Sequence, residues 1–149
     1  MNISEVLKPE NINLSLTDIS KESALDTMSE LLYKNGVLTD KDSFLKDVLD
    51  RESISTTGIG NAIAIPHGKS VCVKETTAAI GRLKTPVEWE SVDDKPVSVI
   101  VLLAVNDNDK SGNHVRLLSQ IARKLVSEEV CKKLSEAKDS DEIIKIFSE

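Results

Sequence analysis

Residues 97–105 form an almost unbroken aliphatic run, Val-Ser-Val-Ile-Val-Leu-Leu-Ala-Val, which constrains the fold more than any other part of the sequence. The run is rich in β-branched residues, and Pro96 precedes it. It is too short for a membrane-spanning helix, which needs about 20 apolar residues. A short, continuously apolar strand is typical of the middle of a sheet whose two faces are both covered by helices. We therefore expect a central strand in an α/β protein.

The rest of the chain alternates between strand-like and helix-like segments. Further strands are predicted at residues 11–16, 62–65 and 76–83. Helices are predicted over residues 20–34 with Ser20 as the N-cap, from Thr39 to about residue 52, and over residues 113–126, 128–137 and 140–147. No internal repeat or flexible linker divides the sequence. Residues 1–149 are therefore expected to form one domain, with a sheet of four or five strands covered by helices.

The charge balance argues against a nucleic-acid-binding protein. Lysine and arginine number 19 and aspartate and glutamate 25, a net charge of −6 with neutral histidines. The densest basic segment, residues 116–133, is interrupted by Glu128 and Glu129 and is typical of a solvated helix surface. The sequence also lacks the apolar segment of a signal peptide, so a cytoplasmic location is expected.

The two cysteines, Cys72 and Cys131, do not form a metal-binding motif. They lie far apart in the sequence, and neither belongs to a Cys-x-x-Cys pair. We therefore expect no metal site. Cys72 follows His67 by five residues, so a catalytic thiol is one interpretation and a buried structural cysteine the other, which we favour.

One of only two histidines ends a small, apolar, glycine-containing segment, residues 58–68. His67 stands there between Pro66, which fixes the backbone, and Gly68, which has no side chain to obstruct a donor protein. A neutral imidazole has one bare ring nitrogen, which can attack phosphorus without an added base. An exposed His67 is therefore a candidate phosphoryl acceptor. The alternative is that residues 66–68 are simply a turn after a strand.

His114 and Arg51 are candidates for supporting such a transfer. His114 begins the predicted helix 113–126, where the helix dipole favours a neutral ring that could donate a hydrogen bond to a phosphoryl oxygen. Arg51, near the end of an earlier helix, could neutralise phosphoryl charge. The alternatives are a helix cap or surface residue for His114, and a favourable helix C-terminal charge for Arg51.

The glycines at positions 58 and 60 do not complete a nucleotide-binding motif. The third glycine of the dinucleotide fingerprint is absent, and Ile63 occupies the position at which a P-loop needs its first glycine. A plain binding domain that uses this glycine-rich turn for a small anion remains an alternative.

Taken together, these residues resemble the enzyme IIA domain of the fructose/mannitol type (type 2) of the bacterial phosphoenolpyruvate-dependent sugar phosphotransferase system. The resemblance covers essentially the whole chain, residues 1–149. It rests on Arg51-Glu52, on residues 57–68, on the strand 97–105, and on His114 with the apolar positions that follow it.

The resemblance implies that His67 accepts a phosphoryl group on its tele nitrogen from the phosphocarrier HPr and passes it to a cysteine of enzyme IIB. His114 would bond the phosphoryl oxygens, Arg51 would neutralise their charge, and the Gly68 backbone would lie beside the phosphate. The implied fold is an α/β sandwich with a mixed sheet, and no cofactor or metal is implied.

Two roles are compatible with this resemblance. In the first, the protein is a phosphotransferase component in uptake of a fructose-, mannitol- or galactitol-like sugar, associated with a membrane IIC component through IIB. In the second, a nitrogen-type regulatory homologue, the phosphorylation state controls partner proteins by binding. The sequence leaves the sugar and the oligomeric state open.

Overall fold

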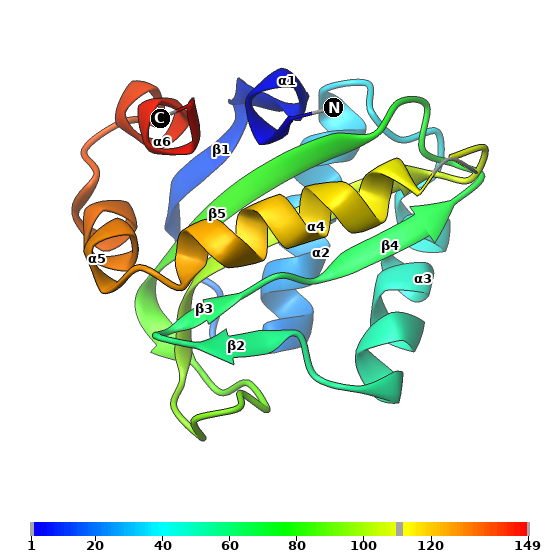
Figure 1. Ribbon diagram of the computed structural model, residues 1–149. Coiled ribbons are helices and arrows are strands. Elements are labelled where there is room, and N and C mark those ends of the chain that lie inside the picture. The colour runs from blue at the N-terminus through cyan, green and yellow to red at the C-terminus, as the bar shows by residue number, and fades with distance from the viewer. Residues whose placement is uncertain (1, 110–111, 149) are drawn as a thin grey trace.

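The aliphatic run forms β6 (Val97–Asn106), the strand around which the sheet is built. Figure 1 shows the sheet with helices on both of its faces. The structure, a computed structural model, describes residues 2–109 and 112–148. The other strands are β1 (Leu7–Leu16), β2 (Gly58–Gly60), β3 (Ile63–Ala64), β4 (His67–Ser70) and β5 (Thr77–Val87). The helices are α1 (Ile3–Val6), α2 (Lys21–Lys34), α3 (Lys41–Ile54), α4 (Asn113–Leu125), α5 (Glu128–Glu136) and α6 (Ser140–Ser148).

Strand β6 is buried on both faces, as the sequence predicts. Because successive side chains of a strand point to opposite sides, its residues divide between two apolar clusters. Val101 and Leu103 pack in the cluster beneath α1, α4, α5 and α6. Ile100 and Leu102 pack in the cluster beneath α2 and α3. The central strand and the α/β sandwich are thereby confirmed.

The sheet is mixed and has six strands, so the expectation of four or five was wrong. Its order is β1-β5-β6-β3-β2, and β4 also pairs with β6. Strands β3 and β4 both run parallel to β6, whereas β5 and β6 are antiparallel. Buried Pro66 separates β3 from β4 and cannot donate a backbone hydrogen bond, but its carbonyl accepts one from Leu103.

Helices α2 and α3 begin at capped residues. The Ser20 side chain accepts a hydrogen bond from the Ser23 amide, which confirms the predicted cap of α2. In α3 the cap is Asp40 and not Thr39, because the Asp40 carboxylate accepts from the Ser43 amide. Within the described residues, no helix combines the length and the apolar character that crossing a membrane requires.

Candidate functional site

His67 is the first residue of β4, where it pairs with Leu103 of β6. The interpretation of residues 66–68 as a simple turn is therefore wrong. The ring is half-buried, so the expectation of an exposed histidine is also corrected. Alternation along β4 directs His67 to the opposite face from Gly68, the face that α4 covers. One side of the imidazole thus faces the protein interior.

A backbone carbonyl determines which ring nitrogen of His67 carries the proton. Nδ1 of His67 lies 3.3 Å from the carbonyl oxygen of Ile65. A carbonyl can only accept, so Nδ1 must donate in this contact. In the neutral ring this arrangement leaves Nε2 without a proton, as a lone-pair nucleophile. A carbonyl fixing the tautomer from the Nδ1 side is what attack through the tele nitrogen requires.

The surroundings of His67 favour that neutral form. Burial lowers the pKa of His67 from its ordinary value of 6.5 by disfavouring the charged ring. The Ile65 carbonyl and the Glu52 carboxylate act in the opposite direction, while the charges of Arg51 and His114 lower the pKa further. The net effect is a ring that is neutral at pH 7 and able to act as a nucleophile.

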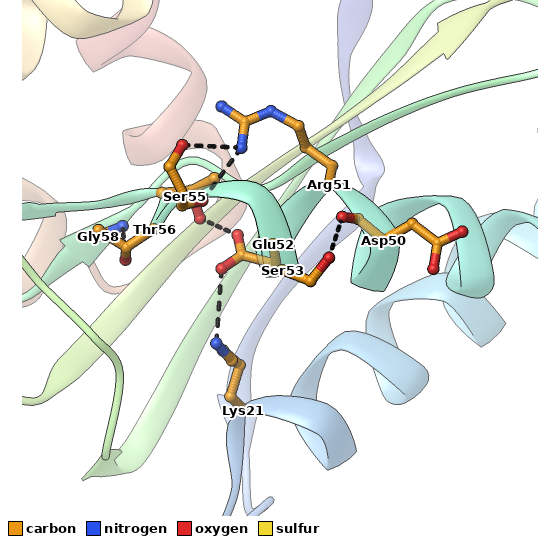
Figure 2. Close-up of polar contacts among 9 residues, drawn as sticks. Lys21, Asp50, Arg51, Glu52, Ser53, Ser55, Thr56 and Gly58 are labelled. Carbon is orange, nitrogen blue, oxygen red and sulfur yellow. Dashed lines mark hydrogen bonds and ion pairs between the residues drawn. The ribbon is translucent and has the colours of Figure 1, made fainter.

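Arg51 lies in the last turn of α3, half-buried and close enough to His67 to influence its pKa. Its Nη1 donates to the carbonyl and to the hydroxyl of Ser55, at 3.1 and 3.3 Å (Figure 2). Because a guanidinium carries five N–H donors, these two bonds orient the group and leave it further capacity to bind an anion. The fold thus places Arg51 close enough to His67 for its charge to act on the ring, while its role in neutralising a phosphoryl group stays a prediction.

His114 lies in the first turn of α4 and also influences the pKa of His67. Its backbone amide and its Nδ1 both bond Oδ2 of Asp109, at 2.9 and 3.2 Å. Because an ionised carboxylate only accepts, Nδ1 is the donor and the ring is held from that side. A phosphoryl oxygen could then be reached through Nε2. Asp109 was missed by the sequence analysis because it lies in a polar loop without a motif.

The structure gives a reason for glycine at position 68 that differs from the expected one, which was room for a donor protein. A Cβ at this position would lie 2.8 Å from Cγ2 of Val48 and 3.2 Å from Cε1 of Phe44, both on α3. Gly68 is therefore small so that α3 can pack directly on β4. Room for an approaching donor protein would have to lie elsewhere. That its backbone lies near a bound phosphoryl group stays a prediction.

The glycine-rich segment that suggested an anion site is part of a hairpin. Strands β2 and β3 are antiparallel and joined at Asn61 and Ala62, which both have positive φ as a type I′ turn requires. The Gly60 amide donates to Oγ of Ser91, and the Asn61 amide donates to Oδ2 of Asp93. Two backbone amides that could have bound an anion thus already donate hydrogen bonds within the protein, one to a hydroxyl and one to a carboxylate.

Cys72 is buried, and its Sγ lies 3.0 Å from the hydroxyl oxygen of Ser70. This position agrees with the structural interpretation of Cys72. Among residues 2–109 and 112–148, no cluster of three or more His, Cys, Asp or Glu side chains could hold a metal ion.

Glu52 and Thr57 form a buried polar pair beside the site, and sequence reasoning gave them no role. The Thr57 hydroxyl donates to the Glu52 carboxylate. Lys21 approaches the same carboxylate from α2 (Figure 2). The only signal in the sequence was the position of Glu52 next to Arg51. Near the end of a helix, the sequence alone does not distinguish a buried glutamate from an exposed one.

The sequence matches the family model "Phosphoenolpyruvate-dependent sugar phosphotransferase system, EIIA 2" over residues 5–149. The chain belongs to this family of phosphoryl carriers, as the resemblance predicted. It is 37% identical over 149 residues to the fructose-specific EIIABC component of Bacillus subtilis (strain 168). That match covers 100% of this chain and 23% of the relative, so the chain spans about a quarter of its length.

Solved structures agree with this assignment. The nitrogen regulatory protein IIA-Ntr from Neisseria meningitidis is 30% identical, with a TM-score of 0.90 over 97% of this chain and 98% of that one. Enzyme IIA of the mannitol system from Escherichia coli, in complex with phosphorylated enzyme IIB, is 24% identical. Its TM-score is 0.79, over 95% of this chain and 98% of that one, and it supports the fold alone.

Proposed function

We propose that this protein carries a phosphoryl group on Nε2 of His67, taking it from phospho-HPr and passing it to a cysteine of enzyme IIB during sugar uptake. The observation that supports this most strongly is the contact between His67 Nδ1 and the Ile65 carbonyl, because it leaves Nε2 as the nucleophilic nitrogen. The sugar would be of the fructose, mannitol or galactitol type, in keeping with the fructose-specific relative.

The two transfers are simple in bond terms. In the first, the Nε2 lone pair of His67 attacks phosphorus while the bond between phosphorus and the donor breaks, and no proton has to be removed from the nucleophile. In the second, a IIB thiolate attacks the same phosphorus and the bond to Nε2 breaks. Both pass through a loose, in-line transition state, so the protein mainly positions groups and stabilises charge.

Arg51 and His114 would supply that stabilisation. The Arg51 guanidinium, oriented by Ser55, would neutralise charge on the phosphoryl oxygens. The His114 ring, held by Asp109, would present Nε2 to one of those oxygens. To donate from Nε2 while Nδ1 bonds the carboxylate, the ring must carry a second proton. The Asp109 carboxylate would balance the resulting positive charge. The form of His114 that donates to the phosphoryl group would therefore be the imidazolium and not the neutral ring.

The partners belong to the proposal. HPr is the donor that the family resemblance implies. A IIB acceptor is included because the mannitol IIA protein, which shares the fold, was solved with phosphorylated IIB. Association with a membrane IIC component would then be indirect, through IIB. The proposal also includes a cytoplasmic location.

A regulatory role is the second candidate function. The observation that favours it is the likeness to the nitrogen regulatory protein of Neisseria meningitidis, which this chain matches along almost its full length. In that role the phosphorylation state of His67 would control binding to target proteins, and the phosphoryl group need not pass to IIB.

Labelling with phosphoenolpyruvate, enzyme I and HPr tests the proposed function. We expect one label on His67 and none in His67→Ala, with Lys84→Ala, an exposed cation on β5, as a control that still accepts label. Absence of label in the wild type, or label that survives His67→Ala, would end the carrier proposal. Adding a fructose- or mannitol-type IIB separates the roles: label moving to the IIB cysteine supports transport, and label retained on His67 supports regulation.

A further inference from the structure

Glu52 is a carboxylate that the fold buries one residue from Arg51. It lies in the last turn of α3, and its side chain is only 4% exposed. Burying a carboxylate is costly unless hydrogen bonds and an opposite charge compensate. A position at the end of a helix could have carried an exposed side chain at no such cost. The burial therefore calls for a structural or functional reason.

Three segments meet at this carboxylate: α3, which carries it, α2, and the segment leading into β2. The Thr57 hydroxyl, in the segment leading into β2, donates to Oε1. Nζ of Lys21, the first residue of α2, lies 3.5 Å from Oε2. No described group gives Oε2 a hydrogen bond, so the Lys21 charge is its compensation among residues 2–109 and 112–148. Lys21 is itself placed over the Trp89 ring, 5.4 Å from its centroid.

A continuous series of hydrogen bonds leads from Glu52 to the imidazole. Thr57, whose side chain bonds Glu52, accepts with its backbone carbonyl from the Ile65 amide at 3.0 Å. Ile65 in turn accepts with its own carbonyl from Nδ1 of His67. The carboxylate thus holds Thr57, Thr57 holds Ile65, and Ile65 holds the ring.

We infer that Glu52 is a positioning residue for His67: through Thr57 it places the Ile65 carbonyl that keeps the proton on Nδ1 and the lone pair on Nε2. The value of this positioning for phosphoryl transfer rests on the proposed function. The positioning itself is a property of the unphosphorylated protein and can be measured without any partner.

The charge of Glu52 has a second consequence at the same ring. Among the described residues, the charged or titratable groups that act on His67 include Arg51 and Glu52 from α3 and His114 from α4. Arg51 and His114 lower the pKa of His67, and Glu52 raises it. Glu52 therefore offsets part of the positive field that Arg51 creates. The hydrogen-bond series and the charge can be separated by different substitutions.

A purely structural role is the competing explanation. In that case Glu52 would only join α2, α3 and the segment before β2, and its loss would lower stability without changing the ring of His67. The tautomer ratio and the pKa of His67 distinguish the two explanations, because a general loss of stability in a folded variant moves neither.

The experiment is ¹⁵N NMR of the unphosphorylated protein, reading the tautomer and the titration of His67. Thr57→Val removes the hydroxyl but keeps the carboxylate, and should shift the tautomer ratio away from Nδ1–H by about two- to tenfold, the range that one neutral hydrogen bond covers. Thr57→Ser keeps a hydroxyl and should restore the ratio. Glu52→Gln retains an oxygen acceptor for Thr57, so it should keep the tautomer but lower the pKa of His67.

Glu22→Gln is the matched control, because it removes the same charge from an exposed position on α2. A tautomer ratio in Thr57→Val equal to that of the wild type, in a variant shown by circular dichroism to be folded, would overturn the inference. The inference would also be overturned if the fraction of the His67 ring that is protonated on Nδ1 fell as much in Thr57→Ser as in Thr57→Val. A wild type that takes no phosphoryl group, with the tautomer responding as stated, would contradict the proposed function and still support the positioning.

Discussion

The carbonyl oxygen of Ile65 lies 3.3 Å from Nδ1 of His67, two residues further along the chain. This one contact connects the backbone at the β3–β4 junction to the chemistry of the ring. Because a carbonyl oxygen can only accept a hydrogen bond, the proton of the neutral imidazole stays on Nδ1 and the nucleophilic lone pair stays on Nε2. Burial of Pro66, between the two residues, keeps the junction fixed.

The first prediction concerns pH. Burial lowers the pKa of His67, so the ring should stay neutral, and able to accept a phosphoryl group, to below pH 6.5. A group whose pKa is lower folded than unfolded binds fewer protons in the folded state. The free energy of unfolding should therefore fall as the pH drops from about 6.5, the unfolded value, through the folded value.

Proton titration of His67 by NMR checks the first part. Denaturant unfolding at several pH values checks the second, and His67→Gln should lose part of the pH dependence. A His67 that titrates at or above pH 6.5 in the folded protein would contradict this prediction.

The second prediction concerns Arg51. Arg51→Ala should slow phosphoryl acceptance by roughly 10- to 100-fold, because hydrogen bonds to charged groups contribute about 1.5–3 kcal/mol. It should also raise the pKa of His67, since the Arg51 charge lowers it. Initial rates of labelling measure the first effect and an NMR titration the second.

Lys46→Ala is the matched control for Arg51→Ala. Lys46 is an exposed cation on the same helix, α3, in an ion pair with Asp50. Its loss should change neither quantity. Equal labelling rates for Arg51→Ala and Lys46→Ala would remove Arg51 from the site.

The third prediction concerns His114. His114→Ala should still take label on His67 but should pass it to IIB more slowly, by roughly tenfold or more, the value of one hydrogen bond to a charged group. Rapid-quench measurement of both steps checks this. A variant that matches the wild type in both steps would show that the ring held by Asp109 has no part in the transfer.

The fourth prediction concerns Gly68. Gly68→Ala places a methyl group against Val48 and Phe44 and should lower the free energy of unfolding by about 1–3 kcal/mol, the usual cost of overpacking. Adding Val48→Ala should recover part of the loss, because it removes the closest atom. Denaturant unfolding of the single and double variants measures both. Unchanged stability in Gly68→Ala would mean that the small residue serves an approaching partner instead.

The elements with strong local signals could be predicted from the sequence. The aliphatic run at residues 97–105 predicts β6 because a segment apolar on both faces has few other places in a fold. Ser20 predicts the start of α2 because its hydroxyl replaces a missing backbone acceptor. The sequence also proposes Arg51, His67 and His114 as site residues, and the fold places Arg51 and His114 close enough to His67 to act on its pKa, while their roles in transfer stay predictions.

The features that depend on tertiary contacts could not be predicted. Strand β4 has the sequence His-Gly-Lys-Ser, which has the composition of a turn, and it is a strand because β6 offers it a pairing edge. The pairing of Glu52 with Thr57 and Lys21 depends on α2 and α3 lying side by side. Neither arrangement leaves a periodic pattern in the sequence.

The most direct measurement is the identity of the phosphorylated nitrogen. Two-dimensional NMR that correlates ³¹P or ¹H with the ring ¹⁵N nuclei of the phosphorylated protein distinguishes Nε2 from Nδ1. The contact between His67 Nδ1 and Ile65 predicts a single phosphohistidine, on Nε2 of His67, with the proton still on Nδ1. Phosphorus on Nδ1 of His67, or on any other residue, would contradict it.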